Sequence, residues 1–530
     1  MAAGAAEEPQ DRLSGLPDDV LHSIIGRVPF KQAVRTNALS RRWPRLWLHA
    51  LAASGVLDFT DRGFVRSQSR AHIVATVNRC LRVRGGGAPI DVLRVSLCPF
   101  GAFERDVVGW IAAALRRGAR EVDVNLTQGR VELGAAFVNC RTELELPGDL
   151  FCAESSLARL SLGRCSLSNV PPGAPGLAGL TSLSLTHVDI TDDAVRDTVA
   201  CCRLLEFLSL RNCHVLKFVR IAGEKLRGLE VVGCLDVRQL QVAAPALESF
   251  AFHGDILCFG EDDGFEFEPV EFIGKGNTRT PSEATPELRD AYLSHIGFGV
   301  YDDPLHEFAF SNLMEKVAHA KILTICSVGL LHIEEERGFI EHMMDPPNLQ
   351  LQELQLLMDS MGDDVVTGFS SFFQLTAPPL LERLFIRLPA AACEHTNSGG
   401  MMSIGEDEDI VLDFEIALDH LTFFKMVNFR GTRREMRLLR FVLRRAPILE
   451  HVVLLTPEEE GRALRPGDDD QNQQLLKIKR MCRRLERPFS GGNPTSWCAG
   501  QERTAAGALH TPSTITMTRQ LGISHFELVF

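Results

Sequence analysis

The chain has no run of eighteen consecutive apolar residues, the length that a helix needs to cross a lipid bilayer. Its first residues, MAAGAAEE, also lack the basic start and the long apolar stretch of a secretory signal. We therefore expect no membrane partner and a location in the cytoplasm, the nucleus or both.

An excess of positive charge is also missing, because 69 acidic residues outnumber 56 basic ones and the formal net charge is −13. Neutralising the phosphates of a nucleic acid requires a clustered basic surface, so no nucleic-acid partner is expected. One basic run, KIKRMCRR at 477–484, has the composition of a nuclear signal or an anion-binding patch. We prefer to interpret it as the solvated face of a helix.

Patterns for metal binding and catalysis are absent as well. The fourteen cysteines include no C-x-x-C pair and no combination with histidines at zinc-finger spacing, so we expect reduced, mostly buried thiols and no metal site. The pairs Glu341-His342 and Glu394-His395 each lack the second histidine, one helical turn away, that a metalloprotease helix requires. We expect no catalytic residues and no cofactor, and the chain is not predicted to be an enzyme.

The most informative segment of the sequence is amphipathic and lies near the N-terminus. Apolar residues from Leu16 to Val28 recur at helical spacing, and Pro17 with two following aspartates favours a helix start. Further short elements are expected around 33–34 and after Ser40, a good N-cap. So short a segment cannot enclose its own apolar surface, which predicts a partner interface with tryptophan anchors.

The stretch from Asp11 to Trp47, which includes the run LSRRW at 39–43, resembles the F-box motif in its plant version. The resemblance implies that residues 9–50 form a three-helix F-box, which binds the Skp adaptor of a Skp-Cullin-F-box ubiquitin ligase. It further implies adaptor contacts for the following residues: Leu16, Pro17, Leu21, Ile24, Val34, Trp43 and Trp47.

A leucine pattern recurs through the middle of the chain. Five copies of L-x-x-L-x-L, with Val at the last position of the fourth and Phe at two positions of the fifth, start at the following residues: Leu157, Leu180, Leu205, Leu226 and Leu247. Their steps of 23, 25, 21 and 21 residues are typical of leucine-rich repeats, and Cys165, Cys213 and Cys234 occupy the position that this pattern reserves for Asn or Cys. Weaker copies extend the predicted solenoid over 85–377, with an inserted loop at about 256–312.

Alternation within each copy points the leucines inward and the intervening residues outward, onto the concave surface where repeat proteins bind partners. The outward positions of the clear copies are mostly small and polar. We interpret this surface as the binding site of an unknown protein target, oriented by Arg211, Glu230 and His253. For any one of these residues, the alternative is a solvated sheet face without a fixed ligand.

The residue pattern of 378–456 predicts a strand through Phe424 and Met426, followed by a turn at Gly431. A helix that ends near Pro447 and a second strand are predicted to follow. This order resembles the FBD domain that follows leucine-rich repeats in plant F-box proteins. We expect it to cap the solenoid, with a separate binding role as the alternative. Residues 457–530 contain few apolar residues at any period and are predicted to be a disordered tail.

Together, these segments predict an α/β fold in which an F-box precedes a leucine-rich-repeat solenoid capped by a strand-helix-strand unit. The resemblance implies a substrate-recognition subunit that joins a cullin through the Skp adaptor and presents a target for ubiquitination. Val28 and Pro44 depart from the family pattern. The alternative is therefore a non-ligase leucine-rich-repeat scaffold or interaction protein with weakened adaptor docking.

Overall fold

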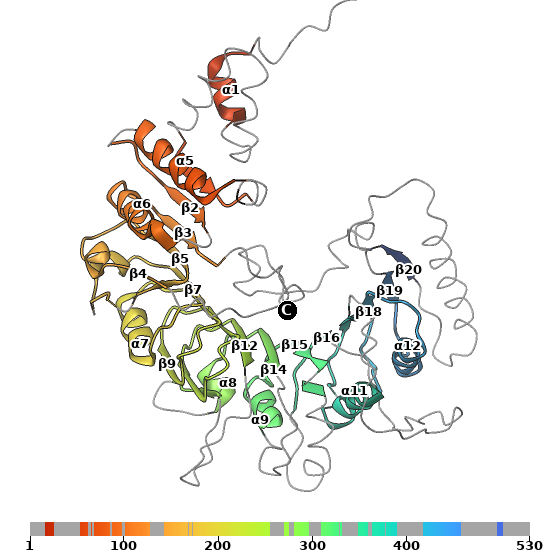
Figure 1. Ribbon diagram of the computed structural model, residues 1–530. Helices are drawn as coiled ribbons and strands as arrows, with labels where there is room; N and C mark the ends of the chain where they lie inside the picture. Colours follow the sequence, from red (N-terminus) through yellow and green to blue (C-terminus); the bar gives the residue numbers. More distant parts are fainter. Residues whose placement is uncertain are drawn as a thin grey trace, which may run out of the picture. The chain divides into compact units, whose positions relative to one another are not determined.

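The computed structural model describes residues 16–25, 54–61, 65, 68–84, 87–97, 101–127, 143–167, 169–171, 173–254, 270–274, 280–295, 309–327, 329–330, 348–358, 363–376, 378–389, 417–456 and 496–501. The chain divides into two compact units, residues 1–216 and 217–530. Each unit is built on a parallel β-sheet (Figure 1).

In the N-terminal unit, six parallel strands are hydrogen-bonded in chain order. They are β1 (Val56–Phe59), β2 (Val92–Ser96), β3 (Glu121–Asn125), β5 (Arg159–Gly163), β7 (Ser182–Thr186) and β8 (Phe207–Arg211). The connecting helices lie on one face of this sheet (Figure 1), and they are α5 (Arg70–Val83), α6 (Glu104–Arg116) and α7 (Asp192–Cys201).

Shorter elements complete the described part of this unit. Helix α1 (Asp18–Ile25) precedes the sheet, and β4 (Leu144–Glu145) pairs with β6 (Cys165–Ser166). Single 3-10 turns cover Gly101–Phe103, Gly148–Phe151 and Pro175–Leu177.

The leucine pattern explains why these strands stack. Leu160, Leu183 and Leu208 are partners in register, and each side chain is at most 1% exposed. The weaker copies continue this apolar row, because Leu93 pairs with Val122 and both are fully buried. Each strand therefore buries its inward residues against its neighbours, which a single repeat could not do, and the leucine-rich-repeat prediction is confirmed.

Cys165, Cys213 and Cys234 follow strands at equivalent positions and are buried, as predicted. Each thiol lies 3.5–3.8 Å from the carbonyl oxygen two residues earlier. The residue before each cysteine has a left-handed backbone, with φ values of 57°, 52° and 69° at Arg164, Asn212 and Gly233. These three strands, β5, β8 and β10, thus end with a left-handed turn, and the small thiol fills the space beside it.

The C-terminal unit continues with a longer parallel sheet. Its strands, in hydrogen-bonded order, are β10 (Gly228–Val232), β12 (Ser249–Gly254), β14 (Asp290–His295), β15 (Ile322–Cys326), β16 (Glu353–Leu357), β17 (Arg383–Arg387), β18 (Phe423–Val427), β19 (His451–Thr456) and β20 (Ser496–Gln501). Its helices are α8 (Pro281–Ala284), α9 (Ala309–Lys316), α11 (Asp363–Thr376) and α12 (Arg433–Arg445).

A second, three-stranded parallel sheet accompanies the start of this unit. It consists of β9 (Phe218–Ala222), β11 (Gln239–Ala243) and β13 (Val270–Phe272). The repeats here step by only 21 residues, which leaves too little chain for a helix and its two turns. A short strand fits instead, and it buries alternate residues such as Val219 and Ile221.

Two sequence expectations need correction. The predicted inserted loop at 256–312 contains β13, α8, β14 and α9, and β14 is a full member of the main sheet. The leucine pattern does not predict β14, because Ala291 occupies the position at which the neighbouring strands have a large apolar residue. Within the predicted disordered tail, 496–501 form β20, which pairs with the otherwise open edge of β19.

The FBD-like segment has the predicted order of strand, turn, helix and strand. Gly431 has a φ of 76°, as its role in the turn requires, and α12 follows directly. The Thr432 side chain and Glu435 form a capping box at the start of this helix, and Phe441 packs edge-to-face on Phe369 of α11 with ring centroids 5.4 Å apart. β18 and β19 extend the main sheet, so the segment continues the repeat fold.

Candidate interaction surfaces

The first candidate surface belongs to α1. The carbonyl oxygen of Pro17 accepts hydrogen bonds from the backbone N–H groups of Val20 (3.2 Å) and Leu21 (3.1 Å). Asp18 and Asp19 occupy the first turn, where the helix dipole favours negative charge. The helix therefore starts as predicted, with Pro17 just before the first helical residue.

The apolar residues of α1 divide between two faces. Leu21 and Ile25 are 0% and 4% exposed, whereas Val20 and Ile24 are 43% and 40% exposed. The exposed pair is spaced four residues apart and so forms a continuous apolar stripe along the helix. An exposed stripe of this kind is typical of a protein interface.

The predicted adaptor residues are placed differently by the structure. Ile24 and Pro17 are exposed, Leu16 is half-buried, and Leu21 is buried, where it anchors the helix. The remaining predicted contacts lie outside the described residues, and they are Val34, Trp43 and Trp47. Val20, which was not among the predicted contacts, joins the accessible side of the helix.

The second candidate surface lies on the face of the N-terminal sheet opposite the helices. Asp58, Arg94 and Asp123 are partners in register on β1, β2 and β3, and they continue into Ser161 of β5. Glu121 and Arg159 pair directly beside this row. We call the five charged residues the charged strip, and they are Asp58, Arg94, Glu121, Asp123 and Arg159.

Ion pairs connect the charged strip across four strands. Arg94 contacts Asp58 at 3.2 Å and Glu121 at 2.6 Å, and the second carboxylate oxygen of Glu121 contacts Arg159 at 2.6 Å. The Glu121 side chain is 11% exposed, whereas that of Arg159 is 64% exposed. The buried carboxylate therefore holds two arginines that remain accessible to a partner.

The ionisation of the two buried acids differs. Burial acts to raise the pKa of Glu121, but hydrogen bonds and charge from Arg94 and Arg159 outweigh it and hold the pKa below its usual value. Burial raises the pKa of Asp123, and the hydrogen bond from Ser161 opposes this only in part. Both groups are fixed in place, so the charged strip offers a preorganised pattern of charge rather than loose side chains.

The predicted target residue Arg211 ends β8, in the same unit as the charged strip. It is half-buried, and its Nε atom donates a hydrogen bond to the hydroxyl oxygen of Ser209 at 3.2 Å. Ser209 continues the register row through Ser184 to Ser161. Small serines thus separate Arg211 from the charged residues of this face.

Glu230 and His253 lie in the C-terminal unit and are buried, at 1% and 6% exposure, whereas the sequence pattern predicted outward, accessible side chains. Glu230 pairs in register with Ala251, and His253 with Val232. Burial lowers the pKa of His253 to about 4, so its imidazole is neutral near pH 7.

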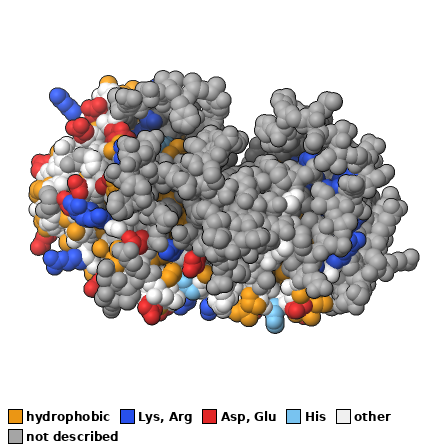
Figure 2. Space-filling model, turned by 90° about the horizontal axis from the view of Figure 1, so that it is seen from below, with side chains coloured by type: hydrophobic (Ala, Val, Ile, Leu, Met, Phe, Trp, Pro, Cys, Tyr) orange, Lys and Arg blue, Asp and Glu red, His pale blue; other side chains and the backbone are white. Residues whose placement is uncertain are grey.

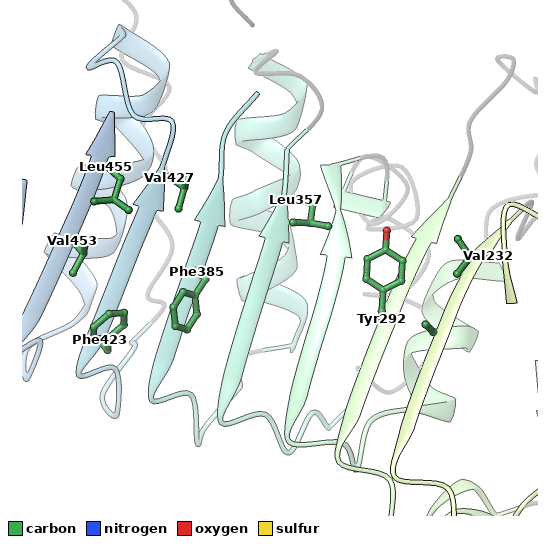
Figure 3. Close-up of a cluster of buried hydrophobic side chains, with 9 residues drawn as sticks. Val232, Tyr292, Leu357, Phe385, Phe423, Val427, Val453 and Leu455 are labelled. Carbon is green, nitrogen blue, oxygen red and sulfur yellow. The ribbon is translucent and has the colours of Figure 1, made fainter. Parts of the chain in front are cut away.

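The reason for this burial is the apolar character of the same face in the C-terminal unit. Apolar side chains on this face form one buried cluster (Figure 3), which consists of Val232, Ala251, Tyr292, Leu357, Phe385, Phe423, Val427, Val453 and Leu455. Between Tyr292 and Phe385 the register passes through Thr324 and Gln355, which are polar and also buried. Strands buried on both faces read as nearly continuous apolar runs, such as ILTIC in β15. The small polar row of the clear repeats therefore does not extend through this unit.

Three residues of the charged strip were missed because they belong to weak copies of the repeat. In Leu93-x-Val95 and Val122-x-Val124 the intervening residues are Arg94 and Asp123, and the same reading of β1 gives Asp58. The signal was present in the sequence, since each of these three charges stands between two apolar residues. Extending the outward row into these copies would have found it.

Other functional classes find little support among the described residues. In that part of the chain, no three His, Cys, Asp or Glu residues gather where a metal ion could sit. No helix among the described segments is both long enough and apolar enough to span a bilayer.

Figure 2 shows one face of the molecule, on which acidic and basic side chains are interspersed.

Comparison with known proteins identifies three domains in this chain. The family model of the F-box domain matches residues 13–50, that of the At1g61320/AtMIF1 LRR domain matches 104–272, and that of FBD matches 415–454. The segment 104–272 includes β3 of the charged strip, and 415–454 includes α12.

Proteins from Arabidopsis thaliana are similar to this chain over part or most of their length. F-box/FBD/LRR-repeat protein At1g13570 is 26% identical over 462 residues, which cover 84% of this chain and 91% of the relative. F-box protein At5g03100 is 26% identical over 224 residues, or 42% of this chain and 64% of the relative. F-box/LRR-repeat protein At3g03360 is 25% identical over 246 residues, or 45% of this chain and 46% of the relative.

Proposed function

We propose that this chain, an F-box protein with leucine-rich repeats and an FBD domain, is a substrate-recognition subunit of a Skp-Cullin-F-box ubiquitin ligase. The F-box binds the Skp adaptor, the adaptor links the chain to a cullin, and the repeats hold the target. The chain itself performs no chemistry in this proposal. It raises the local concentration of a target lysine at the conjugating enzyme.

The observation that carries the proposal is the presence of two surfaces with different chemistry. The stripe of Val20 and Ile24 is apolar and suits a permanent partner, whose affinity comes from buried apolar area. The charged strip is polar and preorganised, which suits recognition of one partner among many. A receptor that joins a fixed adaptor to a chosen target requires both.

The adaptor half of the proposal is tested with the double variant Val20→Asp and Ile24→Asp. Both side chains are exposed, so the variant should fold while adaptor affinity falls about thirtyfold or more, the scale of an interface hot spot of about 2 kcal/mol. Calorimetry with purified Skp adaptor measures the change. The control is Val83→Asp on α5, where the valine is 45% exposed and no adaptor contact is proposed.

Unchanged adaptor affinity in the double variant would contradict this assignment. An equal loss in the Val83→Asp control would also contradict it, because the effect would then not belong to α1. If the unaltered chain captures a target but no adaptor, the non-ligase scaffold is the correct function instead.

A further inference from the structure

A groove of about 670 Å³ lies between α5 and α6 of the N-terminal unit, on the helical side of the sheet. Three arginines from these two helices and the turn that follows α6 line it, namely Arg82, Arg105 and Arg117, together with one acid, Asp106. The lining therefore carries two more positive than negative charges, in a chain whose net charge is −13. The positive charge of this groove has no role in the proposed adaptor or target surfaces.

The floor of the groove is fixed by hydrogen bonds. Asn78 donates from Nδ2 to Oδ1 of Asp106 at 2.8 Å, and its own Oδ1 accepts from the indole Nε1 of Trp110 at 2.7 Å. Trp110 is 2% exposed, so this chain of bonds is held in the packed interface of the two helices. One oxygen of the only acid that lines the groove is thereby engaged with the protein.

The guanidinium of Arg117 is the group that most directly indicates a ligand. Its Nη1 atom is buried and has no hydrogen-bond partner, although most buried polar groups in folded proteins have one. Burial and the charge of Arg117 lower the pKa of Arg84, and the nearby charge of Asp91 offsets them only in part. A second positive charge beside a buried, unsatisfied donor is costly unless an anion balances both.

We propose that this groove binds a phosphate monoester. A phosphate dianion matches the excess of two positive charges, and its oxygens accept hydrogen bonds from the paired N–H groups that a planar guanidinium offers. The shared chemistry is the phosphate group, carried either by a phosphorylated side chain of a partner protein or by a free phosphorylated small molecule.

The probes that distinguish these two sources are inorganic phosphate, O-phosphoserine and a short phosphoserine peptide, titrated calorimetrically into the full-length chain. Saturable binding of the free probes at a stoichiometry of one supports the site with a small-molecule ligand. Tighter binding of the peptide by tenfold or more supports a phosphorylated protein. No saturable binding by any probe overturns the proposal.

Charge variants test whether the groove arginines do the binding. Arg82→Gln combined with Arg105→Gln should weaken binding at least tenfold, because two positive charges are removed from exposed side chains. The variant also removes the exposed hydrogen bond that Arg82 Nε donates to the carbonyl oxygen of Asn78 at 3.3 Å. Arg116→Gln is the matched control, since Arg116 is exposed on α6 next to Arg117 but does not line the groove. An equal loss in the control would show unspecific attraction and overturn the site.

A neutral variant tests the cavity itself. Outside the backbone of α6 and its chain neighbours, a Cβ placed on Gly109 would meet no atom within 4 Å, so Gly109→Leu should fit α6 and occupy part of the groove without altering any charge. We expect loss of phosphate binding with an unchanged or higher melting temperature. Undiminished binding would place the anion elsewhere and overturn the proposal.

Arg117 separates a ligand role from a structural one. Arg117→Gln removes the unsatisfied donor, so the melting temperature should not fall, while phosphate binding should fall at least tenfold. The indole N–H resonance of Trp110, assigned through Trp110→Phe, should shift on phosphate addition in the unaltered chain and not in Arg117→Gln. A large fall in melting temperature without a change in binding would show that Arg117 is structural.

Discussion

At the scale of single residues, the turns after β5, β8 and β10 combine a left-handed residue with a buried cysteine. Gly233 adopts a φ of 69° and donates its N–H to the carbonyl oxygen of His253 at 2.7 Å. Arg164, His187 and Asn212 adopt similar φ values with a side chain attached, and this costs roughly 1 kcal/mol each. Gly233 thus adopts the left-handed conformation without strain, whereas the residues with a side chain at this position of other repeats are strained.

A pair of Gly→Ala substitutions measures this bend. Gly233→Ala should lower the free energy of unfolding by about 1–2 kcal/mol, because alanine is strained in the left-handed region. Gly109→Ala, in the interior of α6 with open space around the added methyl group, should raise it by about 0.5–1 kcal/mol. Urea unfolding measures both, and effects of the same sign would refute the conformational explanation.

His253 makes stability depend on pH. Its pKa is about 4 in the folded chain and near 6.5 when unfolded, so below pH 6.5 the unfolded chain binds a proton that the folded chain does not. The free energy of unfolding should therefore fall between pH 6.5 and 4, by at most about 1.4 kcal/mol per unit from this residue. His253→Gln should flatten the slope, whereas replacing the exposed His72 should not.

At the scale of elements, α12 depends on its capping box. Glu435 is 3% exposed, and one carboxylate oxygen accepts from the N–H groups of Arg430 (2.9 Å) and Thr432 (3.0 Å). The N–H of Glu435 in turn donates to the hydroxyl oxygen of Thr432 at 3.3 Å. The start of the helix, which closes the turn of the FBD segment, is therefore fixed from both sides.

Thr432→Ala should cost about 1 kcal/mol, the usual value of an N-cap. Glu435→Ala should cost more, because it leaves two N–H groups without their carboxylate in a buried site. Chemical denaturation of the full chain measures both changes. If Glu435→Ala proves the milder of the two, the carboxylate is not what fixes this helix start.

Element prediction from the sequence succeeded where the leucine spacing was regular. Leu160, Leu183 and Leu208 were placed inward because a strand alternates, and the strand-helix-strand order after Phe423 followed from periodicity and Gly431. β14 was missed because Ala291 hides the repeat, and β9 because short repeats replace a helix with a strand. The alternation of apolar and polar residues in a strand predicts which side chains face the core. It does not predict whether the opposite face of the sheet is also buried, and the burial of Glu230 was therefore unexpected.

At the scale of the whole molecule, adaptor binding and target recognition should be separable. Arg94→Gln with Arg159→Gln removes the positive charges of the charged strip, and Glu121→Gln is added so that no buried carboxylate is left without its arginines. The two arginine side chains are 38% and 64% exposed, so the triple variant should remain folded, which its melting temperature checks. Proximity labelling should then lose target proteins while adaptor labelling stays the same.

The control for this variant is Arg196→Gln, which breaks an exposed ion pair with Asp193 on α7, away from the charged strip. Deleting residues 1–50 should give the opposite result, with targets labelled and adaptor lost. Target labelling that survives the charged-strip variant would move recognition to another accessible surface, such as that around Arg211.

The strand order has a consequence for how the chain is made. Within each unit, every strand of the main sheet pairs with the strands that come before and after it among the repeats, so each pairing closes a short stretch of chain. Leu183, for example, meets Leu160 on one side and Leu208 on the other. Folding can therefore proceed repeat by repeat as the polypeptide leaves the ribosome, with each new strand finding its template already formed.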